Sequence, residues 1–167
     1  MTLATTPRVE LIPVHALTAT EREAVLALRI SAEQLEFAGA VAKGLAACEA
    51  GDPAAIAGLA IRTAGAIVGW VALKRGAAAP AWVEPGAAVV SGLRVDVRQQ
   101  GRGIGAAALA EMACWVARHW PESSRLVLRV DDGNGAGIRA YERAGWVEIG
   151  ERFVGRVGLE RTMTLAL

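Results

Sequence analysis

The segment Gln100-Gly101-Arg102-Gly103-Ile104-Gly105 decides the fold of this chain. It follows a mostly apolar run, residues 87–95, which predicts a strand, and it opens a stretch with helical spacing of apolar residues, 105–119. Glycines between a strand and a helix leave backbone N–H groups unobstructed at the positive end of the helix. The sequence therefore predicts a binding site for a phosphate-bearing ligand at this turn.

The segments on either side predict a mixed α/β fold with helices covering a central sheet. Two possible capping boxes, Thr20 with Glu23 and Ser31 with Gln34, predict helices that begin near residues 20 and 31 and end near 28 and 48. A further helix ends near Ala144. The predicted strands cover residues 9–12, 55–63, 66–73, 87–95, 126–130, 146–149 and 159–165.

Length and composition fit one domain, residues 1–167, with a formal net charge of +1. This charge argues against a broad surface for nucleic-acid binding. It leaves open a local basic patch formed by arginines, such as Arg98, Arg102, Arg139 and Arg143. We expect a cytoplasmic protein without a membrane partner, because there is no signal peptide and no apolar run of spanning length. The two cysteines have no neighbours with metal-ligand spacing, so no metal site is predicted, and we expect Cys114 to be buried.

Three phosphate ligands compete for the glycine turn. A nucleoside triphosphate loop is excluded because no Gly-Lys-Ser/Thr follows the glycines. A dinucleotide fingerprint is matched by Gly101, Gly103 and Ala106, with Asp131 after a later strand. That motif begins beyond the middle of the chain, however, and too few residues remain for a complete doubly wound sheet.

Two segments support the third ligand, acetyl-CoA. The segment LRVDVRQQGRGIG (93–105) resembles the acetyl-CoA motif of the GCN5-related N-acetyltransferases (GNAT), which ends in Q/R-x-x-G-x-G/A. The segment NGAGIRAYERAGW (134–146) resembles the N-x-x-A-x-x-x-Y-E-x-x-G-F/W segment of the same family. Two positions depart from the family pattern: Val97 replaces a common proline, and Gly137 replaces a usual alanine.

The resemblance implies the acyl-CoA N-acyltransferase fold, a mainly antiparallel central sheet with a splayed pair of parallel strands. Acetyl-CoA is then the cosubstrate, with its pantetheine beside the backbone groups of Val95 and Val97. The pyrophosphate would bind at the glycine turn, and the implied residues are Gln100, Gly101, Arg102, Gly103, Gly105 and Ala106.

Tyr141 and Asn134 take their roles from the second segment. Tyr141 occupies the position of the family's general acid, which donates a proton to the departing CoA sulfur. The plainer interpretation is a ring that packs on the sheet. Asn134 matches a residue that contacts the cofactor, and it also suits the N-cap of the following helix.

The acceptor is implied to be a primary amine, expected on a small molecule such as a polyamine, with amino acids and aminoglycoside-like amines left open. Residues 31–37, with Glu33 and Glu36, faintly resemble the spermine/spermidine acetyltransferase branch, and their charge suits a polycation. The general base is open among Glu33, Glu36, Glu84 and water. A protein amine as acceptor, an acetyl-CoA-binding module without turnover, and a homodimer through the closing strands also stay open.

Overall fold

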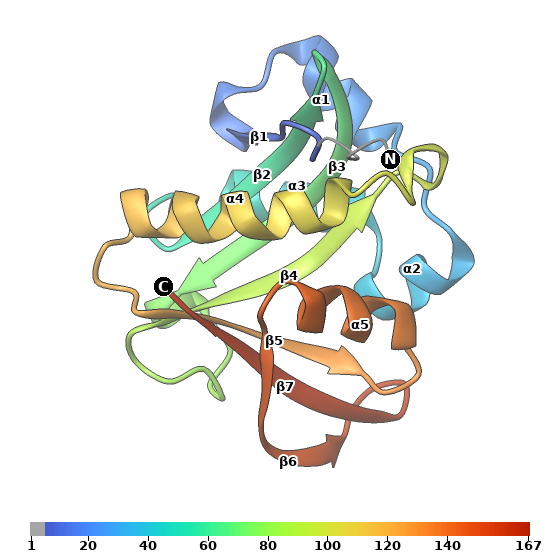
Figure 1. Ribbon diagram of the computed structural model, residues 1–167. Helices are drawn as coiled ribbons and strands as arrows, with labels where there is room; N and C mark the ends of the chain where they lie inside the picture. The colour runs from blue at the N-terminus through green and yellow to red at the C-terminus, as the bar shows by residue number, and fades with distance from the viewer. Residues whose placement is uncertain (1–5) are drawn as a thin grey trace.

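The computed structural model describes residues 6–167, in which seven strands form one sheet in the order β1-β2-β3-β4-β5-β7-β6 (Figure 1). Every neighbouring pair is antiparallel except β4 with β5, which is parallel. The strands are β1 (Glu10–Pro13), β2 (Ile56–Thr63), β3 (Ala66–Arg75), β4 (Ala87–Val95), β5 (Arg125–Asp131), β6 (Val147–Val154) and β7 (Leu159–Ala166). The expected mixed sheet with a single parallel pair is confirmed.

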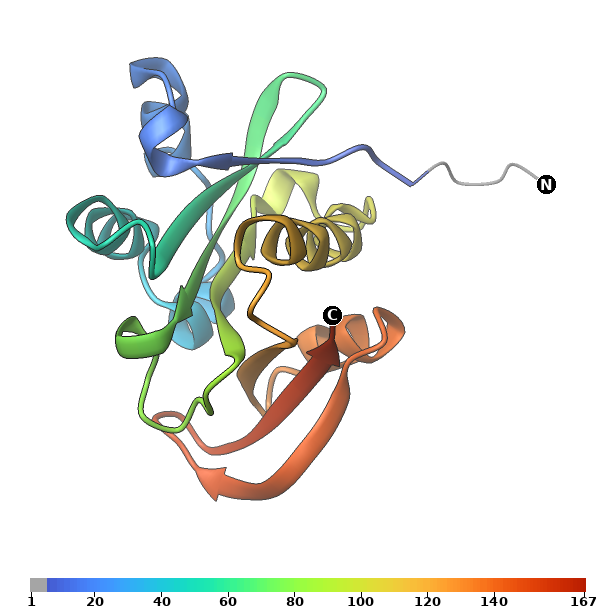
Figure 2. The same cartoon turned by 90° about the vertical axis from the view of Figure 1, so that its left-hand side faces the viewer.

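Helices pack on both faces of this sheet (Figure 2). On one face, Leu59 and Val71 belong to the same buried cluster as Met112 of α4, while on the other Ala60 and Trp70 pack with α1 and α3. This alternation follows from the two-residue period of a strand buried on both sides. The helices are α1 (Ala19–Leu26), α2 (Ala32–Ala38), α3 (Val41–Ala50), α4 (Ile104–His119) and α5 (Gly135–Arg143), with single turns η1 (Val14–Ala16), η2 (Gly76–Ala78) and η3 (Val97–Gln99).

Two features of the N-terminal helices differ from the prediction. The first capping box is formed by Thr18 and Glu21, two residues before the predicted Thr20 and Glu23. The second, Ser31 with Gln34, is confirmed, but the helix it begins ends at Ala38. Gly39 has a φ of +73°, which a right-handed helix cannot contain, so residues 32–50 form two helices instead of one.

Cys114 is exposed on α4, so the prediction that it is buried was wrong. The helix presents its apolar stripe to the sheet through other residues, including Met112, Trp115 and Val116. Cys48 is buried, and desolvation raises the pKa of its thiol. Within residues 6–167, no helix is both long enough and apolar enough to cross a membrane.

Strands β4 and β5 separate soon after they pair (Figure 1). Their register covers only residues 87–89 of β4 and 125–127 of β5. Beyond that point, β4 is irregular against β3, and Gly92 has a φ of +63°. The buried Arg94 side chain holds this irregularity by donating to Gly92 O (3.0 Å) and to Ala38 O. A glycine in the left-handed region beside a disrupted ladder is typical of a β-bulge.

Candidate active site

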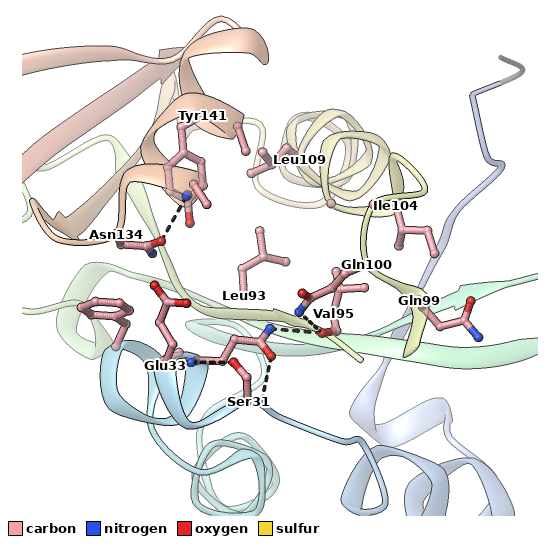
Figure 3. Close-up of a pocket in the computed structure, with 18 of the residues that line it drawn as sticks. Ser31, Glu33, Leu93, Val95, Gln99, Gln100, Ile104, Leu109, Asn134 and Tyr141 are labelled. Carbon is pink, nitrogen blue, oxygen red and sulfur yellow. Dashed lines mark hydrogen bonds between the residues drawn. The ribbon is translucent and has the colours of Figure 1, made fainter. Parts of the chain in front are cut away.

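A cavity of about 360 Å³ lies where β4 and β5 separate (Figure 3). Its walls come from α2, the end of β4, the glycine turn with the start of α4, and α5. Of the residues expected at the cofactor site, seven line it: Val95, Gln100, Gly101, Gly103, Gly105, Asn134 and Tyr141. Three do not: Val97, Arg102 and Ala106. Among residues 6–167, no three His, Cys, Asp or Glu side chains lie together so that they could hold a metal ion.

The glycine turn leads directly into α4 with a left-handed residue at its N-cap, Gly103 (φ +77°), and no side chain caps the helix there. The N–H groups of a first helical turn have no partner within the helix, so they face the cavity as donors for an anion. Gly105 has no positive φ, and a Cβ built on it would meet no protein atom within 4 Å. The fold therefore does not require glycine at position 105, whereas close approach of a ligand to the backbone favours a residue with little or no side chain, as the G/A position of the family motif allows.

Asp96 fixes the path of the chain between β4 and this turn. It is 2% exposed, and its carboxylate accepts from the N–H groups of Arg29 and Arg98, each at 2.9 Å. The Arg98 guanidinium also pairs with it, at 2.7 Å. The hydrogen bonds from Arg98 are the main reason that the pKa of Asp96 lies well below its usual value. Arg98 is thereby paired with Asp96 and is not free to contribute to a local basic patch.

At the end of β4, some of the backbone groups expected beside pantetheine already have hydrogen-bond partners within the protein. Asp96 N–H donates to Val68 O (2.8 Å), so the groups of Val95 point away from β3. The Val95 carbonyl, however, accepts from the side-chain amides of both Gln34 and Gln100, each at 3.1 Å. Val97 N–H donates to Arg29 O (3.0 Å). The Val95 carbonyl and the Val97 N–H therefore already have partners within the protein, and the contact of pantetheine with these two residues stays a prediction.

Tyr141 projects from α5 toward the cavity (Figure 3). Its ring lies 5.9 Å from the ring of Trp146 and packs against the main core, so the plainer role, packing on the sheet, is present. Desolvation raises the pKa of Tyr141 to about 12, which keeps the phenol protonated at neutral pH. A packed ring with a protonated hydroxyl beside the cavity is compatible with a proton donor.

Asn134 is the N-cap of α5, and its Oδ1 accepts from Gly137 N–H (3.0 Å). Gly137, which departs from the family pattern, lies directly against the Asn134 side chain. A Cβ at position 137 would lie 2.6 Å from Asn134 Nδ2 and 2.9 Å from its Oδ1. Glycine at this position therefore leaves space for the Asn134 side chain above the first turn of α5, where it lines the cavity.

A second cavity, of about 410 Å³, adjoins the first. The two share Phe37, Ala38, Leu93, Asn134 and Tyr141 as lining residues, so Tyr141 stands in the wall between them. The second cavity also has charged residues from β3, β5 and β7 and an aromatic residue from the loop before β4: Lys74, Arg129, Asp131, Glu160 and Trp82.

The three carboxylates considered as general base lie in different places. Glu33 lines the first cavity, whereas Glu36 and Glu84 line neither. Glu84 is largely exposed and pairs with Arg125. The acidic residues of the second cavity, Asp131 and Glu160, are not among the general-base candidates that the sequence gives. The only signal in the sequence was the position of Asp131 at the end of an apolar strand, shortly before Asn134.

A sheet that opens between one parallel pair, with a glycine turn and a helix N-terminus at the opening, defines the class of acyl-CoA N-acyltransferases. The model of the acetyltransferase (GNAT) family matches residues 24–146, and the chain belongs to this family. It is an acetyl-CoA-dependent N-acetyltransferase, with acetyl-CoA as its cosubstrate. The expectation drawn from the two motifs is thereby confirmed.

Solved structures show the same fold along nearly the whole chain. The GNAT domain of S. lividans PAT is 26% identical with a TM-score of 0.70, covering 96% of this chain and 90% of that one. AAC(6')-Ib in complex with paromomycin and acetyl-CoA is 15% identical with a TM-score of 0.72, covering 96% and 93%. A chimeric spermidine N-acetyltransferase from Vibrio cholerae and hSSAT is 17% identical with a TM-score of 0.69, covering 95% of each chain. No curated protein matches this chain.

Proposed function

We propose that this chain transfers the acetyl group of acetyl-CoA to the primary amine of a small molecule, with Tyr141 as general acid. The observation that carries the proposal is the position of Tyr141 in the wall shared by the two cavities. One cavity begins at the glycine turn, where a phosphate-bearing cosubstrate fits, and the other offers carboxylates to a cationic acceptor. A side chain that touches both is placed to act where the two substrates meet.

The cosubstrate would be held mainly by backbone. The N–H groups of Arg102, Gly103, Gly105 and Ala106 would receive the pyrophosphate at the start of α4. The room beside Gly105 supports this assignment, because a Cβ there would approach a ligand and not the protein. On the opposite wall, Asn134 Nδ2 is left as a donor, since its Oδ1 is used by Gly137 N–H.

Acetyl-CoA supplies a thioester whose carbonyl carbon is open to attack by an amine. Tyr141 would give its phenolic proton to the sulfur as the carbon–sulfur bond breaks. Its raised pKa, to about 12, keeps the proton in place until sulfur becomes basic. The hydrophobic packing that raises this pKa also holds the ring in one orientation beside Trp146.

A small acceptor is favoured over a protein amine by the shape of the second cavity. Its volume of about 410 Å³ lies in the range typical of small-molecule sites. Carboxylates from β5 and β7 suit a cationic amine, so polyamines and aminoglycosides are the first candidates. Structural neighbours include a spermidine N-acetyltransferase and an aminoglycoside acetyltransferase, and also a ribosomal-protein-S18-alanine N-acetyltransferase from Escherichia coli.

A thiol reagent that measures CoA release tests the proposal across spermidine, paromomycin, free amino acids and a peptide with N-terminal alanine. We expect release with at least one of the small amines and not with the peptide. Release with the peptide alone would replace the small-molecule acceptor by a protein. No release with any acceptor, together with a rise in melting temperature on adding acetyl-CoA, would indicate a binding module without turnover.

A further inference from the structure

Asp131, the last residue of β5, is a buried acid without a partner. It is only 9% exposed, and its Oδ1 is inaccessible and accepts no hydrogen bond from residues 6–167. None of the salt bridges formed within this part of the chain includes it. Burying a carboxylate without a donor is costly, and native proteins keep such a group chiefly where a ligand or a reaction uses it. The described residues leave this carboxylate oxygen unpaired, which indicates a ligand that pairs with it.

The surroundings of Asp131 favour a cationic ligand. Asp131 pairs across the sheet with Glu160 of β7, so both side chains project from the same face. Like charges directly opposite each other destabilise a sheet unless a cation lies between them. Both residues line the second cavity, so two acidic residues contribute to its wall from neighbouring strands.

The cations of this cavity are held elsewhere. The Arg129 guanidinium lies between two aromatic rings, 4.0 Å from the ring centre of Trp82 and 4.0 Å from that of Phe153. Glu160 is close enough to influence the pKa of Arg129, but no salt bridge joins them within residues 6–167. Lys74 comes from β3, which β4 separates from β5 in the sheet. Neither cation therefore satisfies Asp131.

The position of Asp131 is also tied to that of Tyr141. The Asp131 carbonyl accepts from Asn134 N–H (2.9 Å), and Asn134 caps α5, the helix that carries Tyr141. Asp131, Asn134 and Tyr141 all line the second cavity. One short turn thus fixes an acid and a potential base at the same opening of the sheet.

We propose that Asp131 receives the acceptor ammonium and takes the proton that the amine must lose before it attacks. This assignment rests on the proposed function above. The ammonium loses two protons in all. The first passes to the Asp131 carboxylate and on to solvent. The nitrogen then forms its bond to the acetyl carbon as the carbon–sulfur bond breaks, and its second proton replaces the one that Tyr141 gives to sulfur.

The test compares Asp131→Asn with the wild type, using spermidine, paromomycin and butylamine as acceptors. We expect kcat/KM at pH 7 to fall about 100-fold or more for every acceptor that the wild type uses. The deficit should shrink as the pH approaches about 10, because more of an alkyl amine then arrives already deprotonated. The rise in melting temperature caused by CoA should be unchanged, and the variant itself should melt no lower than the wild type, since it loses an unpaired buried charge.

Asp52→Asn is the matched control. Asp52 is exposed, lies outside both cavities, and uses its Oδ1 to accept from Ala54 N–H, which an asparagine can still do. We expect wild-type activity from it at every pH.

Three results would overturn the assignment of Asp131 alone while the wild type stays active. The first is a kcat/KM of Asp131→Asn within about twofold of the wild-type value. The second is a deficit in kcat/KM that stays constant with pH. The third is a melting temperature of the variant below that of the wild type, or failure of the variant to fold. The last would show that the carboxylate has a structural role. A wild type that releases CoA with none of the three amines would instead contradict the proposed function, and the assignment of Asp131 would fall with it.

Discussion

The proposed chemistry depends on the phenolic hydroxyl of Tyr141. Its removal by Tyr141→Phe keeps the ring that packs against Trp146 and the core. We therefore expect an unchanged melting temperature and unchanged acetyl-CoA affinity, with kcat lower by about tenfold or more, roughly 1.4 kcal/mol of barrier. Steady-state kinetics with the best acceptor measures this, and an unchanged kcat would remove Tyr141 from the mechanism.

The buried carboxylate of Asp96 has a structural role, in contrast to Asp131. Because it accepts hydrogen bonds from Arg29 and Arg98, we expect Asp96→Asn to destabilise the fold by about 2–4 kcal/mol. Its pKa in the native state lies below the ordinary value of 3.8, so this stabilisation is complete above about pH 4 and is lost as the pH falls further.

Urea unfolding of the wild type and of Asp96→Asn at pH 7 and at several lower pH values measures this contribution. The difference in unfolding free energy should narrow as the pH falls below about 4. A difference that stays constant with pH would show that the charge of Asp96 does not contribute. A difference near zero at pH 7 would show that the hydrogen bonds to Asp96 do not hold the turn.

At the scale of the element, the start of α4 allows the phosphate site to be tested without damage to the fold. A Cβ at position 105 meets no protein atom, and glutamate suits the first turn of a helix better than glycine does. The family motif accepts alanine at this position, so the test needs a larger side chain. Gly105→Glu should be at least as stable as the wild type and yet bind CoA at least about tenfold more weakly, by isothermal titration calorimetry, because its charge opposes the pyrophosphate. Gly103→Val is less suitable, because the φ of +77° at Gly103 strains a branched residue.

Gly158→Glu is the control for that experiment. Gly158 lies between β6 and β7, has no positive φ, and a Cβ there would also meet nothing within 4 Å. Its CoA affinity should equal that of the wild type. Equal affinity in Gly105→Glu as well would contradict the assignment of the pyrophosphate to the N-terminus of α4.

The elements could be predicted where local signals were unique. The patterns of the glycine turn, the hairpin strands and the helix after Asn134 each predict a single type of structure, and all of these elements are present. The first capping box was misplaced because both Thr18 with Glu21 and Thr20 with Glu23 satisfy the same pattern, and tertiary contacts choose between them. The end of α2 was missed because a single glycine, Gly39, is often tolerated within a helical pattern.

The same holds for the site: residues within local sequence motifs could be predicted, whereas contacts between distant segments could not. Tyr141, Asn134 and the cavity-lining glycines lie in two contiguous motifs, so their proximity follows from the order of strand, turn and helix. The partners of Val95 and Val97 depend on Gln34 and Arg29, which are distant in the sequence. The significance of Asp131 rests on burial and on its strand partner Glu160, and neither can be read from local spacing.

At the scale of the whole molecule, the opening between β4 and β5 gives the protein one cavity for the cosubstrate and an adjoining one for the acceptor. A ligand that binds the native state raises the melting temperature. We therefore expect acetyl-CoA and CoA to raise it and NAD to have no effect. A rise with NAD and none with CoA would restore the dinucleotide interpretation of the glycine turn.

The central claim is that an acetyl group moves from acetyl-CoA to a small cationic amine in this opening. The most direct measurement is mass spectrometry of spermidine and paromomycin after incubation with acetyl-CoA and the wild-type protein, with the released CoA counted in the same sample. We predict an amine heavier by one acetyl group, formed in equal amount to CoA and strongly reduced with Tyr141→Phe. CoA release without an acetylated amine, or no release at all, would contradict the claim.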